Sequence, residues 1–226
     1  MNKQAKDILR KNKKEIIYLV LIITTIFIVD QIIYTTDQNH LIKYTIIKTI
    51  YNLIKGFINL WISLVIIYIS MQNITGKTVN LKEFIIDSLS DIKQILYVYA
   101  IYFIILIIVS LFTIPIISTI IVQALLVFVW QVYLIDNKRK LEVFTVSVSV
   151  VFSNINKVIK YIMMYFGVLI MMALINLLPI KMEYLEKGFI IMVQYFGLLI
   201  LNYLTIMFTI IYMEIKENKT KQSALS

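Results

Sequence analysis

One apolar segment carries a regular series of polar side chains, and these residues are the ones most able to do chemistry. They recur at steps of 4, 3, 4 and 4 and are Lys48, Asn52, Lys55, Asn59 and Ser63. This spacing places all five on one face of a helix. Polar groups inside a membrane are costly and face the bundle interior or a substrate pathway. We therefore predict an intramembrane polar stripe running inward from the outer surface.

The charge of Lys55 leaves two interpretations open. Its ammonium group either snorkels to the outer surface along its apolar stem or marks an outer cavity that accepts an anion.

Further amides lie in other apolar segments, and the candidate bundle-facing residues are Gln123, Gln131, Asn176, Gln194 and Asn202. Thr205 and Thr209 continue the helical face of Asn202. Hydrogen bonds between helices explain such residues most simply, at about 0.6 to 2 kcal/mol each.

The residue inventory argues against catalysis. The chain has no cysteine, and its one histidine, His40, falls in a predicted outer loop. The sequence contains no HExxH, GxSxG or glycine-rich phosphate loop. We therefore expect a protein that is not an enzyme and that holds no metal or cofactor.

The composition of the chain indicates that these residues lie in a membrane. Of 226 residues, 60% are hydrophobic and 15% are charged, whereas soluble domains carry about 25% charged residues. Long apolar runs favour helices over a barrel. The predicted fold is all-α, a polytopic integral membrane bundle formed by one domain, 1–226.

Six segments have the roughly 20 mainly apolar residues that a spanning helix needs. The predicted spans are 15–35, 50–71, 95–114, 116–135, 161–178 and 188–213. Two amphipathic helices, 81–94 and 141–160, are expected on the cytoplasmic face.

Basic residues set the orientation of these spans. With the N-terminus inside, 17 of the 22 Lys and Arg residues lie in cytoplasmic segments, as the positive-inside rule requires. Both termini are therefore predicted to be cytoplasmic. The basic residues that give the net charge of +9 are therefore expected to face anionic lipid rather than to bind nucleic acid. The bias towards Ile, Lys and Asn is typical of bacteria with AT-rich genomes, so the expected location is a bacterial cell membrane.

Segment 141–160 contains the alternating run Val146-Ser147-Val148-Ser149-Val150, which is typical of a strand. A helix is nevertheless predicted, because apolar residues recur at helical steps: Leu141, Phe144, Val148, Val151, Ile155 and Val158. This helix either turns the chain along the membrane surface or forms a docking or gating surface.

An internal repeat supports the same interpretation. Ser90-Asp91-Ile92-Lys93 lies 63 residues before Ser153-Asn154-Ile155-Asn156, and Tyr102-Phe103 lies 63 residues before Tyr165-Phe166. A weaker copy is residues 5–12. The chain is thus predicted to contain three units, each a lead-in helix followed by a transmembrane hairpin.

The pattern resembles the bacterial six-span families related to the membrane domain found beside glycerophosphodiester phosphodiesterases, many of them of unknown function. The matching features are 5–12 before the first span, Gly76-Lys77 before an amphipathic helix, and Asp136 before a helix containing Ser153-Asn154. Those families usually have glycines and prolines between the third and fourth spans, whereas this sequence has only Pro115 there. The resemblance implies a membrane protein that does not itself hydrolyse phosphodiesters.

Three functions are compatible with these features. The main expectation is a transport or export subunit that handles an amphipathic or lipid-like substrate, with an ATPase or another membrane subunit as partner. The alternatives are an immunity protein that binds a membrane-active hydrophobic peptide, and a scaffold for cytoplasmic partners.

Overall fold

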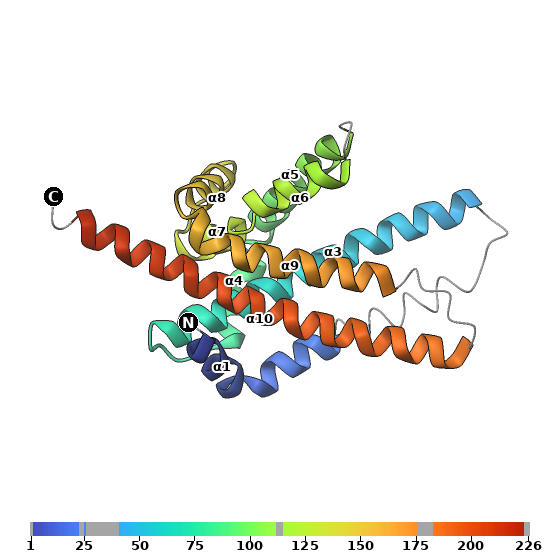
Figure 1. Cartoon of the computed structure of the whole chain (residues 1–226), viewed down its shortest axis with the longest axis horizontal. Helices are drawn as coiled ribbons and strands as arrows, with labels where there is room; N and C mark the ends of the chain where they lie inside the picture. The colour runs from blue at the N-terminus through green and yellow to red at the C-terminus, as the bar shows by residue number, and fades with distance from the viewer. Residues whose placement is uncertain (1, 23–24, 26–40, 112–114, 176–182, 224–226) are drawn as a thin grey trace.

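The chain is built from helices, as predicted. A computed structural model describes residues 2–22, 25, 41–111, 115–175 and 183–223, and these residues contain no strand. The helices are α1 (Asn2–Lys11), α3 (Leu41–Ile74), α4 (Leu81–Ser90), α5 (Ile92–Ser110), α6 (Pro115–Leu125), α7 (Val129–Ile135), α8 (Glu142–Ser153), α9 (Ile155–Ile175) and α10 (Glu183–Ser223), shown in Figure 1. Residues 13–22 are also helical.

Within the described residues, three helical segments are long and apolar enough to cross a membrane. They are Leu53–Ile74, Ile92–Val109 and Tyr195–Lys221. A fourth is added if α8 and α9 are counted as one span bent by 107°. The protein therefore has helices that could span a membrane, and the predicted spans 50–71, 95–114 and 188–213 overlap three of them. Most of the predicted span 15–35 lies outside the described residues.

The predicted span 116–135 is not a continuous helix. Turn residues 126–128 separate α6 from α7, and the apolar stretch Ile120–Ile135 is shorter than a full span. Ser147 of α8 explains how this break is stabilised. Its hydroxyl donates to the carbonyl of Leu125 at 2.9 Å and accepts from the amide of Phe128 at 3.2 Å. The side chain thus pairs two backbone groups that the break frees in an apolar setting.

The alternating Val-Ser run is helical, as predicted, but its exposed and buried faces differ from the prediction. Phe144 and Val151 are buried, whereas Leu141 is 59% exposed. Ser147, at a polar position of the alternation, is fully buried. Ser147 is buried because it contacts the broken segment 116–135. Periodicity within one helix cannot reveal a contact with another segment.

Both predicted lead-in helices are shorter than expected. α4 ends at Ser90 instead of 94, and α8 ends at Ser153 instead of 160. In each case one residue, Asp91 or Asn154, interrupts the helix before α5 or α9 begins.

The two breaks lie 63 residues apart, which is the period of the predicted repeat, and Asn12 forms a third break after α1. At each break the amide four residues later is on a buried residue and donates to the carbonyl of the break residue. These bonds join Ile16 to Asn12 at 3.1 Å, Ile95 to Asp91 at 3.1 Å and Val158 to Asn154 at 3.2 Å. The Asn12 and Asn154 amides also donate to the carbonyls four residues earlier, at 2.9 and 3.0 Å. The breaks at Asp91 and Asn154 therefore fit the 63-residue period, whereas Asn12 lies 79 residues before Asp91 and does not.

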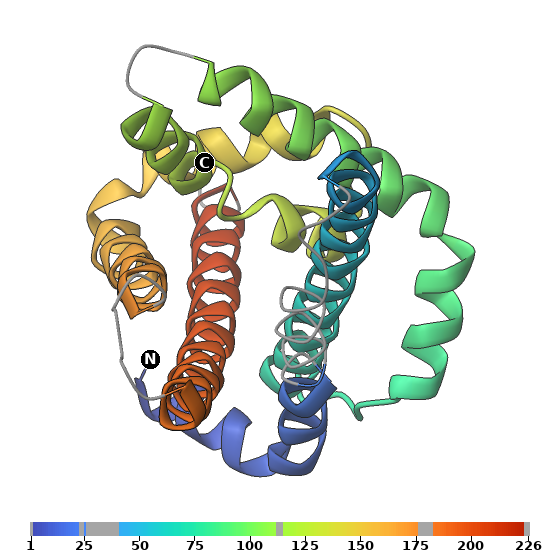
Figure 2. The same cartoon turned by 90° about the vertical axis from the view of Figure 1, so that its right-hand side faces the viewer.

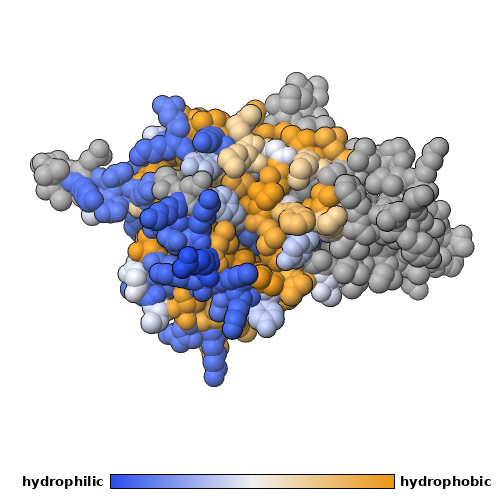
Figure 3. Space-filling model, turned by 60° about the horizontal axis from the view of Figure 1, so that its bottom comes forward, coloured by the Kyte–Doolittle hydropathy of each residue, from blue (hydrophilic) through white to orange (hydrophobic). Residues whose placement is uncertain are grey.

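α10 is the central helix of the bundle. It packs against α9, α3 and α1, and Figure 2 shows it between α9 and α3. Its buried face includes Leu204, Met207, Ile210 and Ile211. α1, α4 and α8 gather towards the end of the molecule where the C-terminus lies (Figure 1). Hydrophilic residues collect at that end, and apolar residues cover the middle (Figure 3).

The break between α6 and α7 yields a stability prediction. Ser147→Ala removes the partner of two buried backbone groups, so we expect a loss of about 1–3 kcal/mol in the free energy of unfolding. Chemical unfolding of the purified protein in detergent micelles measures it. Ser149→Ala is the matched control, because Ser149 is exposed on the same helix. Equal stability of the two variants would contradict this role of Ser147.

Candidate functional site

A cavity of about 300 Å³ lies among α3, α5, α6, α7, α9 and α10. Its polar lining residues are Asn59, Ser63, Gln123, Gln131 and Thr205. Its aromatic lining residues are Tyr99, Tyr102, Trp130, Tyr165 and Phe208. Both kinds of side chain line one half-open pocket, so this cavity offers hydrogen bonds beside apolar walls.

Four of the predicted site residues meet at this cavity. Asn59 and Ser63 are the inner end of the polar stripe, and Gln123 and Gln131 come from the two halves of the broken segment. These residues are far apart in sequence, and the sequence analysis did not predict that they would line the same cavity.

The other predicted residues lie elsewhere. Lys55 is partly buried on α3 and does not line the cavity. Asn202 is buried on α10, one turn before Thr205. Lys48, Asn52 and Gln194 belong to α3 or α10, but their side chains are outside the described part, and Asn176 is outside it altogether. The roles predicted for these residues stay predictions.

Two lining hydroxyls bond to their own helices. Ser63 donates to the carbonyl of Asn59 and Thr205 to that of Leu201, both at 3.0 Å. A hydroxyl has one hydrogen, so these two oxygens can offer only lone pairs to the cavity.

Two lining amides, in contrast, have oxygens without a partner. They are Asn59 Oδ1 and Gln131 Oε1, and Gln131 is 3% exposed. A buried polar atom without a hydrogen bond costs about 1–3 kcal/mol. Neither oxygen is exposed to the cavity in this conformation, so a bound molecule would satisfy it only after the amide side chain had turned.

Sequence reasoning missed the aromatic lining, although the repeat contained a signal for it. Tyr102 and Tyr165 occupy equivalent positions of the repeat, 63 residues apart, and both line the cavity. A repeat that places two hairpins in equivalent positions around one centre brings equivalent side chains together there.

Gly56 permits the hydroxyl of Tyr99, on α5, to lie close to the backbone of α3. A Cβ atom at this position would overlap the hydroxyl of Tyr99. The Tyr99 ring cannot shift freely, because it makes an edge contact with Phe57 and stacks on Phe103, with ring centroids 6.2 and 6.4 Å apart. This glycine therefore helps to set the position of one cavity wall.

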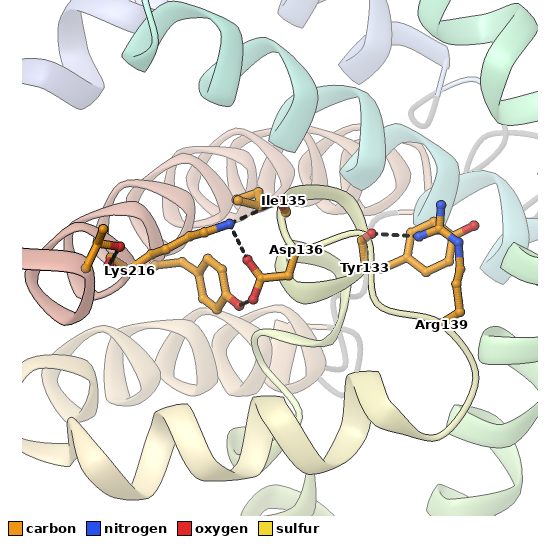
Figure 4. Close-up of polar contacts among 7 residues, drawn as sticks. Tyr133, Ile135, Asp136, Arg139 and Lys216 are labelled. Carbon is orange, nitrogen blue, oxygen red and sulfur yellow. Dashed lines mark hydrogen bonds and ion pairs between the residues drawn. The ribbon is translucent and has the colours of Figure 1, made fainter. Parts of the chain in front are cut away.

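An ion pair holds α7, which carries Trp130 and Gln131, against α10. The Asp136 carboxylate accepts from Lys216 Nζ at 2.6 Å and from the Tyr212 hydroxyl at 2.5 Å. Lys216 also donates to the carbonyl of Ile135 at 3.3 Å. Figure 4 shows Lys216 reaching the end of α7.

Arg139 lies in the loop between α7 and α8 and makes a second set of contacts, on the other side of this loop from Lys216 (Figure 4). Its guanidinium donates to the carbonyl of Tyr133 at 3.0 Å and pairs with Asp91 at 3.1 Å. Its carbon atom Cζ also lies 4.3 Å from the centre of the Tyr133 ring. Arg139 thus connects the end of α7 to the break between α4 and α5.

The loop between these two contacts has a defined backbone shape. Asn137 and Lys140 have φ values of 53° and 56°, which non-glycine residues adopt uncommonly. Lys138 donates to Glu142 at 2.5 Å, and this hydrogen bond raises the pKa of Lys138 above its ordinary value. The loop and its contacts fix the end of α7 that lies nearest the hydrophilic surface.

The described residues contain no group of three or more His, Cys, Asp or Glu side chains that could hold a metal ion. His40 lies outside the described residues. The expectation that the protein needs no metal or cofactor stays a prediction.

Comparisons with protein-family models, with curated proteins and with solved structures find no match. The resemblance to membrane domains found beside phosphodiesterases therefore stays a prediction.

The contact between α7 and α10 can be tested by mutation. Asp136→Ala leaves the Tyr212 hydroxyl and Lys216 without their acceptor. We expect a loss of about 1–3 kcal/mol in the free energy of unfolding, the range for hydrogen bonds to a charged group. Unfolding in detergent micelles measures this.

Glu142→Ala is the control, because it removes the exposed pair with Lys138, which is worth about 0–1 kcal/mol. If both variants lose the same small amount, Asp136 is not an anchor of α7.

Proposed function

We propose that this chain is a non-enzymatic bacterial membrane protein whose helical bundle binds an amphipathic substrate and serves its transport or export. One observation carries the proposal. Polar residues from α3, α6, α7 and α10 converge on one cavity, where two buried amide oxygens have no partner. Most buried polar groups in proteins are paired, so an unpaired one needs an explanation.

The walls favour a substrate with a polar and an apolar part. Asn59, Ser63 and Gln131 supply hydrogen bonds, while Trp130 and Phe208 supply apolar surface. A volume of about 300 Å³ is at the lower end of ligand sites. It suits a headgroup and the first part of a chain better than a whole membrane lipid.

The same lining argues against catalysis as the main role. The described lining residues include no carboxylate, histidine or lysine that could act as a general acid or base. Transport driven by ATP would use a partner subunit, because the sequence has no phosphate-binding glycine loop.

We further propose six spans, with both termini in the cytoplasm and three helix-plus-hairpin repeats. The recurring breaks at Asn12, Asp91 and Asn154 support three units. The hydrophilic end, which includes α1 and the C-terminal part of α10, supports placing both termini on one side (Figures 1 and 3).

Topology is directly testable, because the chain contains no cysteine. Single variants Lys3→Cys, His40→Cys and Lys219→Cys are exposed to a membrane-impermeant thiol reagent in intact cells. We expect labelling of His40→Cys only, and labelling of the other two after permeabilisation. An odd number of spans predicts a different result, in which one of the two termini is labelled in intact cells.

Substrate binding can be followed through Trp130. The chain has two tryptophans, so Trp61→Phe leaves the cavity tryptophan alone. Dibromostearoyl amphiphiles with glycerol, phosphoglycerol or amine headgroups are titrated into the protein in phosphatidylcholine nanodiscs. We expect at least one of them to quench Trp130 saturably, because it enters the cavity.

Two glycines provide a matched pair of variants for this assay. Gly56→Leu displaces the Tyr99 wall and should weaken binding about tenfold, or about 1.4 kcal/mol. Gly167→Leu should have no effect, because a Cβ there meets nothing within 4 Å. Equal quenching in both variants would place the binding site outside the cavity. If the amphiphile binds but does not move across the membrane, the result would favour the alternative function of an immunity protein.

A further inference from the structure

We infer that the cavity selects amphiphiles whose headgroup is uncharged and carries hydroxyl or amide hydrogens, and that it rejects anionic phosphate headgroups. This inference rests on the proposed function and narrows its substrate class. It follows from the cavity's charge, from its hydrogen-bonding capacity and from its aromatic walls.

The described lining residues carry no formal charge. The polar groups are amides, aliphatic hydroxyls, tyrosine hydroxyls and the indole of Trp130. Lys55 lies one turn from Asn59 but is not part of the lining, and Lys216 is paired with Asp136. Moving an ion from water into such a site is strongly unfavourable unless an opposite charge accompanies it. An anionic or cationic head would find no such charge among these residues.

The hydrogen-bonding capacity of the lining points to a ligand that donates. Ser63 and Thr205 have used their hydrogens within α3 and α10 and offer only lone pairs. Asn59 Oδ1 and Gln131 Oε1 are acceptors without a donor. A phosphate diester, which has only acceptor oxygens, could accept from the tyrosine hydroxyls and the Trp130 indole but could not donate to these amide oxygens. A hydroxyl or amide head donates to them, and it can accept from the tyrosine hydroxyls.

The aromatic walls complete the fit for a small neutral head joined to a chain. The rings of Tyr165 and Phe208 meet edge to face, with centroids 6.4 Å apart, beside Trp130. Such surfaces pack against C–H groups of a glycerol backbone and against the first methylenes of an acyl chain. Gln131, whose buried Oε1 has no partner, lines the same cavity and is the residue that we expect to determine headgroup specificity.

The test uses the single-tryptophan chain, Trp61→Phe, and three probes with the same dibromostearoyl or dibromostearyl chain. Their headgroups are glycerol, phosphoglycerol and a primary amine. Trp130 quenching in phosphatidylcholine nanodiscs gives a dissociation constant for each. We expect the glycerol probe to bind at least about tenfold more tightly than the other two.

Gln131→Leu should weaken binding of the glycerol probe about tenfold. The matched control is Gln72→Leu. The Gln72 amide oxygen also lacks a partner, but Gln72 lies near the end of α3 and outside the cavity lining. This control should bind the glycerol probe like the parent chain. A second reporter, Trp130→Phe, leaves Trp61, which does not line the cavity, and should show no saturable quenching.

The outcomes separate the two proposals. Equal or tighter binding of the phosphoglycerol or amine probe would overturn headgroup selection and leave substrate binding in place. Equal losses in Gln131→Leu and Gln72→Leu would also overturn it. The absence of saturable quenching with every probe would overturn the proposed function itself.

Discussion

The cost of an unpartnered polar group in an apolar interior governs this structure. Water cannot satisfy backbone amides and carbonyls inside a membrane, so a broken helix needs partners from its neighbours. The break between α6 and α7 has such a partner in Ser147, whose single hydroxyl serves one carbonyl and one amide. The breaks at Asn12 and Asn154 use the asparagine side chain to bond back to the preceding turn.

The same cost makes the remaining unpartnered atoms informative. Asn59 and Gln131 keep buried oxygens without donors, while the Ser63 and Thr205 hydroxyls donate within their own helices. Gln72, Tyr133 and Asn202 also keep a buried polar atom without a partner, but of these five residues only Asn59 and Gln131 line the cavity. Binding of a molecule with donor groups would explain these two atoms, and it connects the architecture to the proposed function.

The cavity also depends on contacts that fix its walls from outside. Asp136 and Lys216 hold the end of α7 against α10, and Arg139 connects the same region to Asp91. Gln131 and Trp130 are on α7, which packs against α8 and α3 and is tied to α10 by this ion pair. Tyr102 and Tyr165 reach the cavity from equivalent positions in two hairpins, which is where an internal repeat places similar groups.

Local sequence determined the helical class and the apolar character of the segments that form α3, α5 and α10. It also determined that Asn59, Ser63 and Gln131 are polar residues in apolar segments. These features depend on residues within a few turns of one another, and periodicity reports them directly. Only the tertiary structure decided that 116–135 is broken, that Ser147 is buried, and that Asp136 pairs with Lys216. Each of these depends on residues 19 to 80 positions apart, whose contact is set by how helices pack, and no local pattern contains that information.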